Sequence, residues 1–424
     1  MMNSDQNPAP FSFLVLADIH FGQFSGAPEF RLDGIQQDGK RLSLRDSLIS
    51  TVRNLSTKPT ALFVPGDLTS IASPSEFKGC VETVLGIADA IEISRDSVFF
   101  TYGNHDTNWR ICELGRKIHP TEGKFPTDEH YNHVAATIGG LYVPKANCLQ
   151  EGPVLGSGVY SSEGHIIFVL NSGFYCIAEQ EYPHGRLGQE QLQWLETALN
   201  EFGSTTNWKI LMVHHHPFNY TYPKPIEDIS CIEEGAELVD LAGRLGIDFL
   251  FHGHRHHPRL FTESRTDWKT SMTFFCAGSV AVDAEHRDTG HIPNLFHIVS
   301  INNRLPNRAA FGNIISYQHR TEGWTPVQNR VETPLDHIHW FGCLTSSHEK
   351  NSAAITLIEG VIKSKETDSV ILPSRNELSP QLLCCPIDEL NSLLSSIARE
   401  HGFRIVGKYP DDVALLKSAN GTSK

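Results

Sequence analysis

Aspartates, histidines and one asparagine are concentrated in five short segments of this sequence. The segments read ADIH, GDL, GNHD, HHHP and GHRH, and they begin at residues 17, 66, 103, 214 and 253. Carboxylate, imidazole and amide groups together suit divalent manganese, iron, zinc or cobalt better than a thiolate-seeking metal. A bridging carboxylate can hold two such ions about 3.5–4 Å apart, the separation used for displacement at phosphorus. The residue types therefore indicate a site for two divalent metal ions.

Each segment follows a short apolar run with the length of a β-strand. The runs cover residues 11–17, 60–65, 97–101, 209–213 and 248–251, and further strands are expected at 165–170, 271–277 and 295–301. Amphipathic patterns predict helices at 41–54, 75–91, 189–202 and 232–245. This alternation is typical of α/β layers whose sheets are buried on both faces. Because such sheets bind ligands beyond the carboxyl ends of their strands, we expect the five segments to meet in one site.

Glycine precedes three of the candidate ligands, Asp67, Asn104 and His254. Glycine adopts backbone conformations that other residues resist, so a tight turn is expected at each of these positions. The Asp-x-His spacing of Asp18 and His20, on a turn after a strand, allows both side chains to converge on one ion.

The composition restricts the classes of protein that fit. The chain has 424 residues, of which 40% are hydrophobic and 20% charged, and a formal net charge of −14 with dispersed lysine and arginine. This does not favour nucleic acid as a partner, because a broad basic face is missing. Nine irregularly spaced cysteines without a CxxC pair indicate neither a disulfide framework nor a zinc site. The cysteine usage, the polar start and the lack of a membrane-length apolar run predict a cytoplasmic protein without membrane contact.

A change in composition predicts two domains. Residues 320–334 are polar and contain two prolines, which is typical of a linker. We therefore expect domains at 1–325 and 336–424, the second with a helix at 387–401 and a strand at 403–406. No motif that carries chemistry lies in the second domain. Its role and the oligomeric state are open, and a homo-oligomer is compatible with the sequence.

The ordered series DIH, GD, GNHD, H-x-P and GHRH resembles the calcineurin-like metallophosphoesterase superfamily, over residues 11 to about 300. The resemblance implies a four-layer αββα sandwich, here followed by a small C-terminal α/β accessory domain. It also implies a dinuclear hydrolase of phosphoesters, in which a hydroxide bridging two divalent ions attacks phosphorus.

The resemblance assigns roles to individual residues. The first ion would be bound by Asp18, His20 and His256. The second would be bound by Asn104, His215 and His254, and Asp67 would bind both. His215 is chosen among three consecutive histidines because the family ligand lies two residues before the proline, here Pro217. The neighbouring His214 is then expected to contact the ligands without binding an ion itself, or to lie at the surface. His105 would protonate the leaving oxygen, with Asp106 holding it in orientation.

Departures from family patterns narrow the choice of subfamily. Purple acid phosphatases carry a tyrosine three residues after the GD aspartate, where this chain has Ser70. GDLTSIA and GNHD also differ from the GDxVDRG and GNHE of the protein Ser/Thr phosphatases. The segments LADIHFG, GDLTS and GRLGQEQLQWLETAL are most similar to the cyclic-nucleotide phosphodiesterase-like branch. The substrate that this implies is a small phosphodiester, with 3′,5′-cyclic nucleotides in first place.

Two other functions stay open on the sequence alone. Nucleases of double-strand-break repair use the same fold; DIHFG permits this reading, and the acidic charge disfavours it. A non-enzymatic scaffold could also keep the fold, although it would not need intact ligands. Asn108, Trp109 and Arg110 follow His105 closely enough to reach over the site. Asn108 and Arg110 are candidate substrate contacts, since arginine binds phosphate through two parallel hydrogen bonds.

Overall fold

The computed structural model describes residues 8–31, 43–110, 147–162, 164–176, 185–203, 207–219, 230–283, 292–305, 309–328, 335, 337–344, 346–364 and 369–418. The chain divides into two compact units, Met1–His339 and Trp340–Lys424. The candidate ligands all belong to the first unit.

The described residues of the first unit form two seven-stranded sheets, and β1 lies at the centre of the first. Its order is β13-β12-β11-β1-β2-β3, and β14 pairs with β12 outside this order. β1, β2 and β3 run parallel, whereas β11 pairs with β1 in the antiparallel direction. The strands are β1 (Phe11–Val15), β2 (Ala61–Pro65), β3 (Val98–Thr101), β11 (Leu295–Arg304), β12 (Ala310–Arg320), β13 (Gly323–Pro326) and β14 (Ile338–Phe341).

The second sheet has the order β4-β5-β6-β7-β8-β10-β9. Its inner strands β6, β7, β8 and β10 are parallel, so their carboxyl ends lie at one edge. The strands are β4 (Cys148–Glu151), β5 (Gly158–Ser162), β6 (His165–Val169), β7 (Trp208–Met212), β8 (Phe249–His252), β9 (Arg259–Glu263) and β10 (Met272–Cys276).

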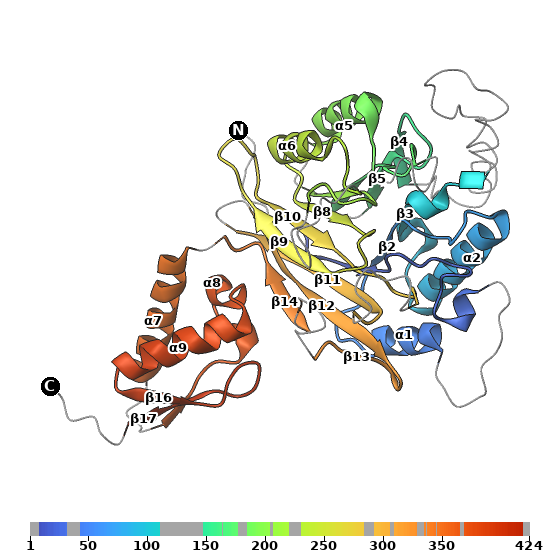
Figure 1. Cartoon of the computed structure of the whole chain (residues 1–424). Helices are drawn as coiled ribbons and strands as arrows, with labels where there is room; N and C mark the ends of the chain where they lie inside the picture. Colours follow the sequence, from blue (N-terminus) through green and yellow to red (C-terminus); the bar gives the residue numbers. More distant parts are fainter. Residues whose placement is uncertain are drawn as a thin grey trace. The chain divides into compact units, whose positions relative to one another are not determined.

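Helices cover the outer face of each sheet (Figure 1). Leucines and valines of α1 (Leu44–Arg53) and α2 (Pro74–Ala90) share one apolar cluster with β1 and β2. Those of α5 (Gly188–Phe202) and α6 (Gly235–Leu245) share another with β6, β7 and β8. Serine and glutamate form a capping box at the start of α2, which satisfies backbone N–H groups that the helix leaves unpaired.

Aromatic side chains fill the space between the sheets. Phe13 and Phe63 of the first sheet contact Phe251 of the second, with ring centroids 5.8 Å and 5.0 Å apart. All three rings are buried, and alternate residues of the same strands face the helices. The predicted four-layer αββα arrangement is confirmed.

The second unit has three strands and three α-helices in its described residues. Its sheet has the antiparallel order β15-β17-β16, with β15 (Ser369–Ile371), β16 (Phe403–Val406) and β17 (Ala414–Lys417). The helices are α7 (Ser347–Ser364), α8 (Pro380–Leu383) and α9 (Ile387–Glu400). Among the described residues of the whole chain, no helix combines the length and apolar character needed to cross a bilayer.

The stretch expected to be a linker is partly a strand. β13 lies within residues 320–334 and pairs with β12, and the indole N–H of Trp324 donates to the Leu44 carbonyl at 2.8 Å. Residues 329–334 lie outside the described part of the chain. The polar composition misled the prediction because one buried tryptophan anchors this segment against α1.

Candidate metal centre

The candidate ligands lie immediately beyond the carboxyl ends of parallel strands in both sheets. They follow β1, β2 and β3 in the first sheet and β7 and β8 in the second. Five of them have left-handed backbones, with φ of 49° at Asp18, 47° at His20, 49° at Asp67, 71° at His254 and 50° at His256. This conformation is costly for residues other than glycine and is concentrated at functional sites. The chain therefore turns sharply where these strands end.

One group of side chains comes from three strand ends. Ligand atoms of Asp18, His20, Asp67 and His256 all lie within 4.8 Å of one another. His20 Nε2 is 3.3 Å from Asp67 Oδ2 and 3.3 Å from His256 Nε2. His256 Nε2 is also 3.6 Å from Asp18 Oδ1. Two carboxylates and two imidazoles in this arrangement can surround a divalent ion.

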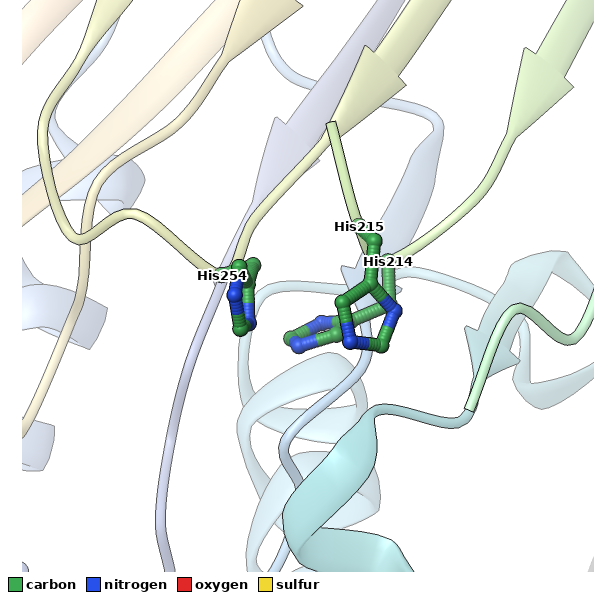
Figure 2. Close-up of side chains that lie close together, drawn as sticks. All are labelled: His214, His215 and His254. Carbon is green, nitrogen blue, oxygen red and sulfur yellow. The ribbon is translucent and has the colours of Figure 1, made fainter. Parts of the chain in front are cut away.

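A second group joins the ends of β3, β7 and β8. Ligand atoms of His214, His215 and His254 lie within 4.8 Å of one another, and Figure 2 shows the three rings next to one another beyond the strand ends. Asn104 belongs to this group, because its Oδ1 is 3.0 Å from His254 Nδ1 and 3.2 Å from His214 Nε2. Amide oxygen and imidazole nitrogen thus converge on a second possible ion.

His214 is oriented toward both groups by a backbone contact. Its Nδ1–H donates to the Pro65 carbonyl at 2.8 Å, so Nε2 is the ring nitrogen directed at the ligand groups. That Nε2 is 3.2 Å from Asn104 Oδ1 and 3.4 Å from Asp67 Oδ2. A ligating histidine is commonly held in this way, by a hydrogen bond from its other ring nitrogen.

His215, the ligand that the family resemblance implies, has different hydrogen-bond partners. Its Nδ1 is 2.8 Å from Ser172 Oγ, and its Nε2 is 3.8 Å from Cys176 Sγ. Ser172 Oγ also accepts the backbone N–H of His215 at 3.0 Å. His214 therefore lies against the asparagine and the shared aspartate, while His215 belongs to the same ligand group, and its role as a ligand stays a prediction.

Asp67 lies between the two groups. Its Oδ2 is 3.3 Å from His20 Nε2 and 3.4 Å from His214 Nε2, and its Oδ1 accepts the backbone N–H of His105 at 3.0 Å. A carboxylate shared by two ions has to lie among the side chains that would hold each of them. Asp67 meets this condition.

The hydrogen bonds of the Asp18 carboxylate show whether the first group suits a cation. Its Oδ1 accepts the backbone N–H of His254 at 2.8 Å, whereas its Oδ2 is buried without a hydrogen-bond partner among the described residues. A buried carboxylate oxygen without a partner is costly. A divalent ion would satisfy it, so the residues present fit the metal that their chemistry implies.

The glycines before the ligands serve two different purposes. Gly66 has φ of 91°, as expected for a turn that other residues resist. Gly103 and Gly253 are not left-handed; a Cβ on Gly103 would lie 2.1 Å from Asp67 Oδ1, and one on Gly253 would lie 2.4 Å from Asp18 Oδ2. The predicted reason is therefore right for Gly66 and wrong for the other two, which leave room for the carboxylates.

His105 lies beside the first group with one ring nitrogen fixed. Its ring centroid is 4.7 Å from that of His20. Its Nδ1–H donates to the Ser70 carbonyl at 3.1 Å, so Nε2 is the nitrogen left for exchange of a proton with a substrate. The backbone of Ser70, in the position where purple acid phosphatases carry tyrosine, thus orients the candidate acid.

Asp106 binds the backbone around His105 and not its ring. Its carboxylate accepts the N–H groups of Leu68 at 3.1 Å, Thr69 at 2.9 Å and Gly103 at 2.9 Å. The prediction that Asp106 orients the His105 ring is corrected accordingly. Asp106 instead ties the GDL and GNHD segments together, because its buried oxygens collect N–H groups from both.

The three residues after the GNHD segment lie differently from one another. Asn108 Nδ2 donates to the Ala72 carbonyl at 3.4 Å, and Arg110 is exposed. Trp109 is half-buried, with its ring centroid 5.2 Å from that of His105. The roles of Asn108 and Arg110 as substrate contacts stay predictions.

Burial and opposite charge act against each other on the acidic and basic groups. Burial raises the pKa of Asp18 to about 7. Burial also disfavours the charged form of His214, but the carboxylate of Asp67 outweighs it and raises the pKa of His214 to about 9. Burial lowers the pKa values of His254 and His256, which keeps them in the neutral form that binds metals.

Residues 11–258, more than half of the chain, match the family model described as calcineurin-like phosphoesterase. The chain belongs to this family. The predicted family is therefore confirmed, while the cyclic-nucleotide branch stays a prediction. No curated protein sequence matches this phosphoesterase.

Three solved structures illustrate what the fold is similar to. A dimetal phosphatase from Danio rerio is 13% identical with a TM-score of 0.43, and the match covers 76% of this phosphoesterase and 98% of that chain. Purple acid phosphatase PPD1 from yellow lupin is 13% identical with a TM-score of 0.44, and the match covers 80% of this phosphoesterase and 57% of that chain. The calcineurin-like phosphoesterase YfkN from Bacillus subtilis is 13% identical with a TM-score of 0.35, and the match covers 76% of this phosphoesterase and 88% of that chain. At these identities and TM-scores they carry no argument about function.

Family membership and the two ligand groups support the same chemistry. The protein is a hydrolase of phosphoesters that depends on divalent metal, with two adjacent ligand groups for a dinuclear site. The ligand types accept several ions, so they do not identify the metal.

Proposed function

We propose that this phosphoesterase hydrolyses phosphodiester bonds in small molecules, with 3′,5′-cyclic nucleotides in first place. The observation that carries the hydrolytic part of the proposal is the position of Asp67, whose Oδ2 contacts a histidine of each ligand group. Asp18, His20 and His256 would hold one ion and Asn104, His214 and His254 the other, with Asp67 shared. When bound, the two ions supply positive charge to the phosphate and lower the pKa of water.

The protein's own side chains divide the remaining tasks. Asp67 accepts the backbone N–H of His105. Asp106 accepts backbone N–H groups of the GDL and GNHD segments, and together the two carboxylates fix the backbone around His105. The Ser70 carbonyl holds Nδ1–H of His105, so when the ring is in its imidazolium form the opposite nitrogen can give a proton to the leaving oxygen. A diester needs this proton because an alkoxide is a poor leaving group.

The choice of a small diester is supported by sequence features that bear on substrate. LADIHFG, GDLTS and GRLGQEQLQWLETAL are similar to the cyclic-nucleotide phosphodiesterase-like branch. The net charge of −14 is unfavourable for binding a polyanion such as DNA or RNA.

The direct test is hydrolysis of diesters by the full-length protein loaded in turn with manganese, iron, zinc and cobalt. We expect metal-dependent release of nitrophenol from bis(p-nitrophenyl) phosphate, faster than from the monoester, and turnover of adenosine 3′,5′-cyclic phosphate. Faster turnover of the monoester would replace the diester proposal with a phosphatase. No turnover of any ester with any of the four ions would contradict hydrolytic function.

The role of His105 predicts an effect that depends on the leaving group. In His105→Asn, kcat for a diester with an alkoxide leaving group is expected to fall about a hundredfold or more, because the proton donor is lost. Nitrophenolate leaves without a proton, so bis(p-nitrophenyl) phosphate should lose less than about tenfold. The measurement is kcat across a series of diesters of graded leaving-group acidity.

His401→Asn is the matched control, because His401 is an exposed histidine at the end of α9. It should leave the whole series unchanged. An equal loss for all leaving groups in His105→Asn would show that His105 positions other groups and does not donate the proton.

A further inference from the structure

Two aromatic side chains from distant parts of the sequence flank the ring of His105. The Phe24 ring lies 5.6 Å from it at an interplanar angle of 87°, and the Trp109 ring lies 5.2 Å from it at 52°. Both aromatic residues are half-buried. Edge and tilted contacts of this kind are those that aromatic rings favour.

Polar contacts hold both residues in place. The indole N–H of Trp109 donates to the Cys176 carbonyl at 3.1 Å. The backbone N–H of Phe24 donates to Ser70 Oγ at 3.0 Å, and the Phe24 carbonyl accepts the Asp283 N–H at 3.0 Å. The indole of Trp109 and the backbone of Phe24 are therefore held before a ligand binds, which limits the freedom lost on binding.

The position of these rings relates to one side of the reacting phosphate. If His105 protonates the leaving oxygen, the group attached to that oxygen must lie next to His105, and therefore near Phe24 and Trp109. A flat unsaturated ring can contact two fixed aromatic side chains by stacking or by its edge. A saturated ring of the same size gains only the apolar contact.

We propose that Phe24 and Trp109 form a subsite for a flat aromatic ring carried by the leaving group, so that the enzyme selects esters of aromatic alcohols or of nucleosides. The proposal rests on the proposed function, because His105 defines the leaving-group side. Phe24 and Trp109 act here as specificity-determining residues.

The test compares ligands that differ only in the flatness of one ring. Benzylphosphonate and cyclohexylmethylphosphonate are not hydrolysed, so calorimetric titration of the metal-loaded full-length protein measures binding alone. We expect benzylphosphonate to bind about tenfold more tightly, the size of two aromatic contacts. This preference should disappear in Phe24→Leu and in Trp109→Leu.

Three variants serve as controls. Trp109→Phe and Phe24→Tyr keep a ring and should keep most of the preference, which separates loss of the subsite from failure to fold. Trp194→Leu changes a half-buried tryptophan on α5, packed in a different cluster, and should leave the preference unchanged.

A second pair of ligands distinguishes the two sources of the ring. The phosphorothioate analogue of adenosine 3′,5′-cyclic phosphate is compared with the corresponding cyclic ribose phosphorothioate that lacks the base. A larger preference in this pair than in the phosphonate pair identifies a nucleobase as the occupant, and the reverse identifies an aryl or benzyl group.

Equal binding of flat and saturated rings by the unaltered protein would overturn the subsite. So would an equal loss of both phosphonates and of inorganic phosphate in the leucine variants, since that marks a role in shaping the metal site. Ring preference without hydrolysis of any ester would contradict the proposed function and not the subsite. Hydrolysis without ring preference would contradict the subsite alone.

Discussion

Replacing Asp67 with asparagine is expected to reduce metal-dependent hydrolysis by at least about a thousandfold. The reason is that one oxygen, Asp67 Oδ2, contacts His20 of the first group and His214 of the second. Asparagine keeps the size of the side chain and tolerates the left-handed backbone at this position, where φ is 49°. The substitution therefore removes the shared negative charge without forcing the turn to change.

The measurement combines turnover with metal content per chain, determined by mass spectrometry after removal of free ions. We expect fewer than two ions per chain in Asp67→Asn and two in the unaltered protein. Asp89→Asn is the control, because Asp89 lies on α2 and pairs with Arg95 at the surface. Asp67→Asn with two ions and an unaltered rate would refute the bridging role.

Replacing His214 with alanine is expected to remove the second ion and to reduce turnover by about a hundredfold or more. Its Nε2 is directed at Asn104 and Asp67 by the hydrogen bond from Nδ1–H to the Pro65 carbonyl. His215→Ala is expected to retain both ions and lose about tenfold or less, because His215 contacts Ser172 and Cys176.

The two adjacent histidines serve as each other's control, since both are fully buried and each variant removes the same atoms. Metal titration by calorimetry gives the number of sites and the affinity of each. Loss of one site in His215→Ala, with both kept in His214→Ala, would restore the ligand that the sequence pattern favours.

Much of the site could be predicted because ligand-bearing residues follow parallel strands. The ends of β1, β2 and β8 were expected within two residues, and the side chains after them do converge. The choice within HHHP could not be predicted in the same way. Three identical side chains follow β7, and only the position of the Pro65 carbonyl in the neighbouring layer decides which ring nitrogen is directed inward.

The parts of the fold that escaped prediction depend on contacts between distant segments. The segment that contains β13 was expected to be a linker because its composition is polar. Trp324 of β13 is nevertheless buried and donates a hydrogen bond to the Leu44 carbonyl. The reach of Asp106 to Leu68 and Thr69 likewise depends on β2 and β3 being neighbours. Periodicity along the chain contains no information about such pairings.

The ligands of each proposed ion come from both sheets, and this makes the metals mechanical parts of the fold. Asp18 and Asp67 extend from one sheet, and His214, His254 and His256 from the other. Bound ions would therefore cross-link the two sheets at the carboxyl ends of these strands. Amide hydrogen exchange should slow on metal loading at the carboxyl ends of β1, β2, β7 and β8, where the layers would otherwise part first, and change least at their amino ends.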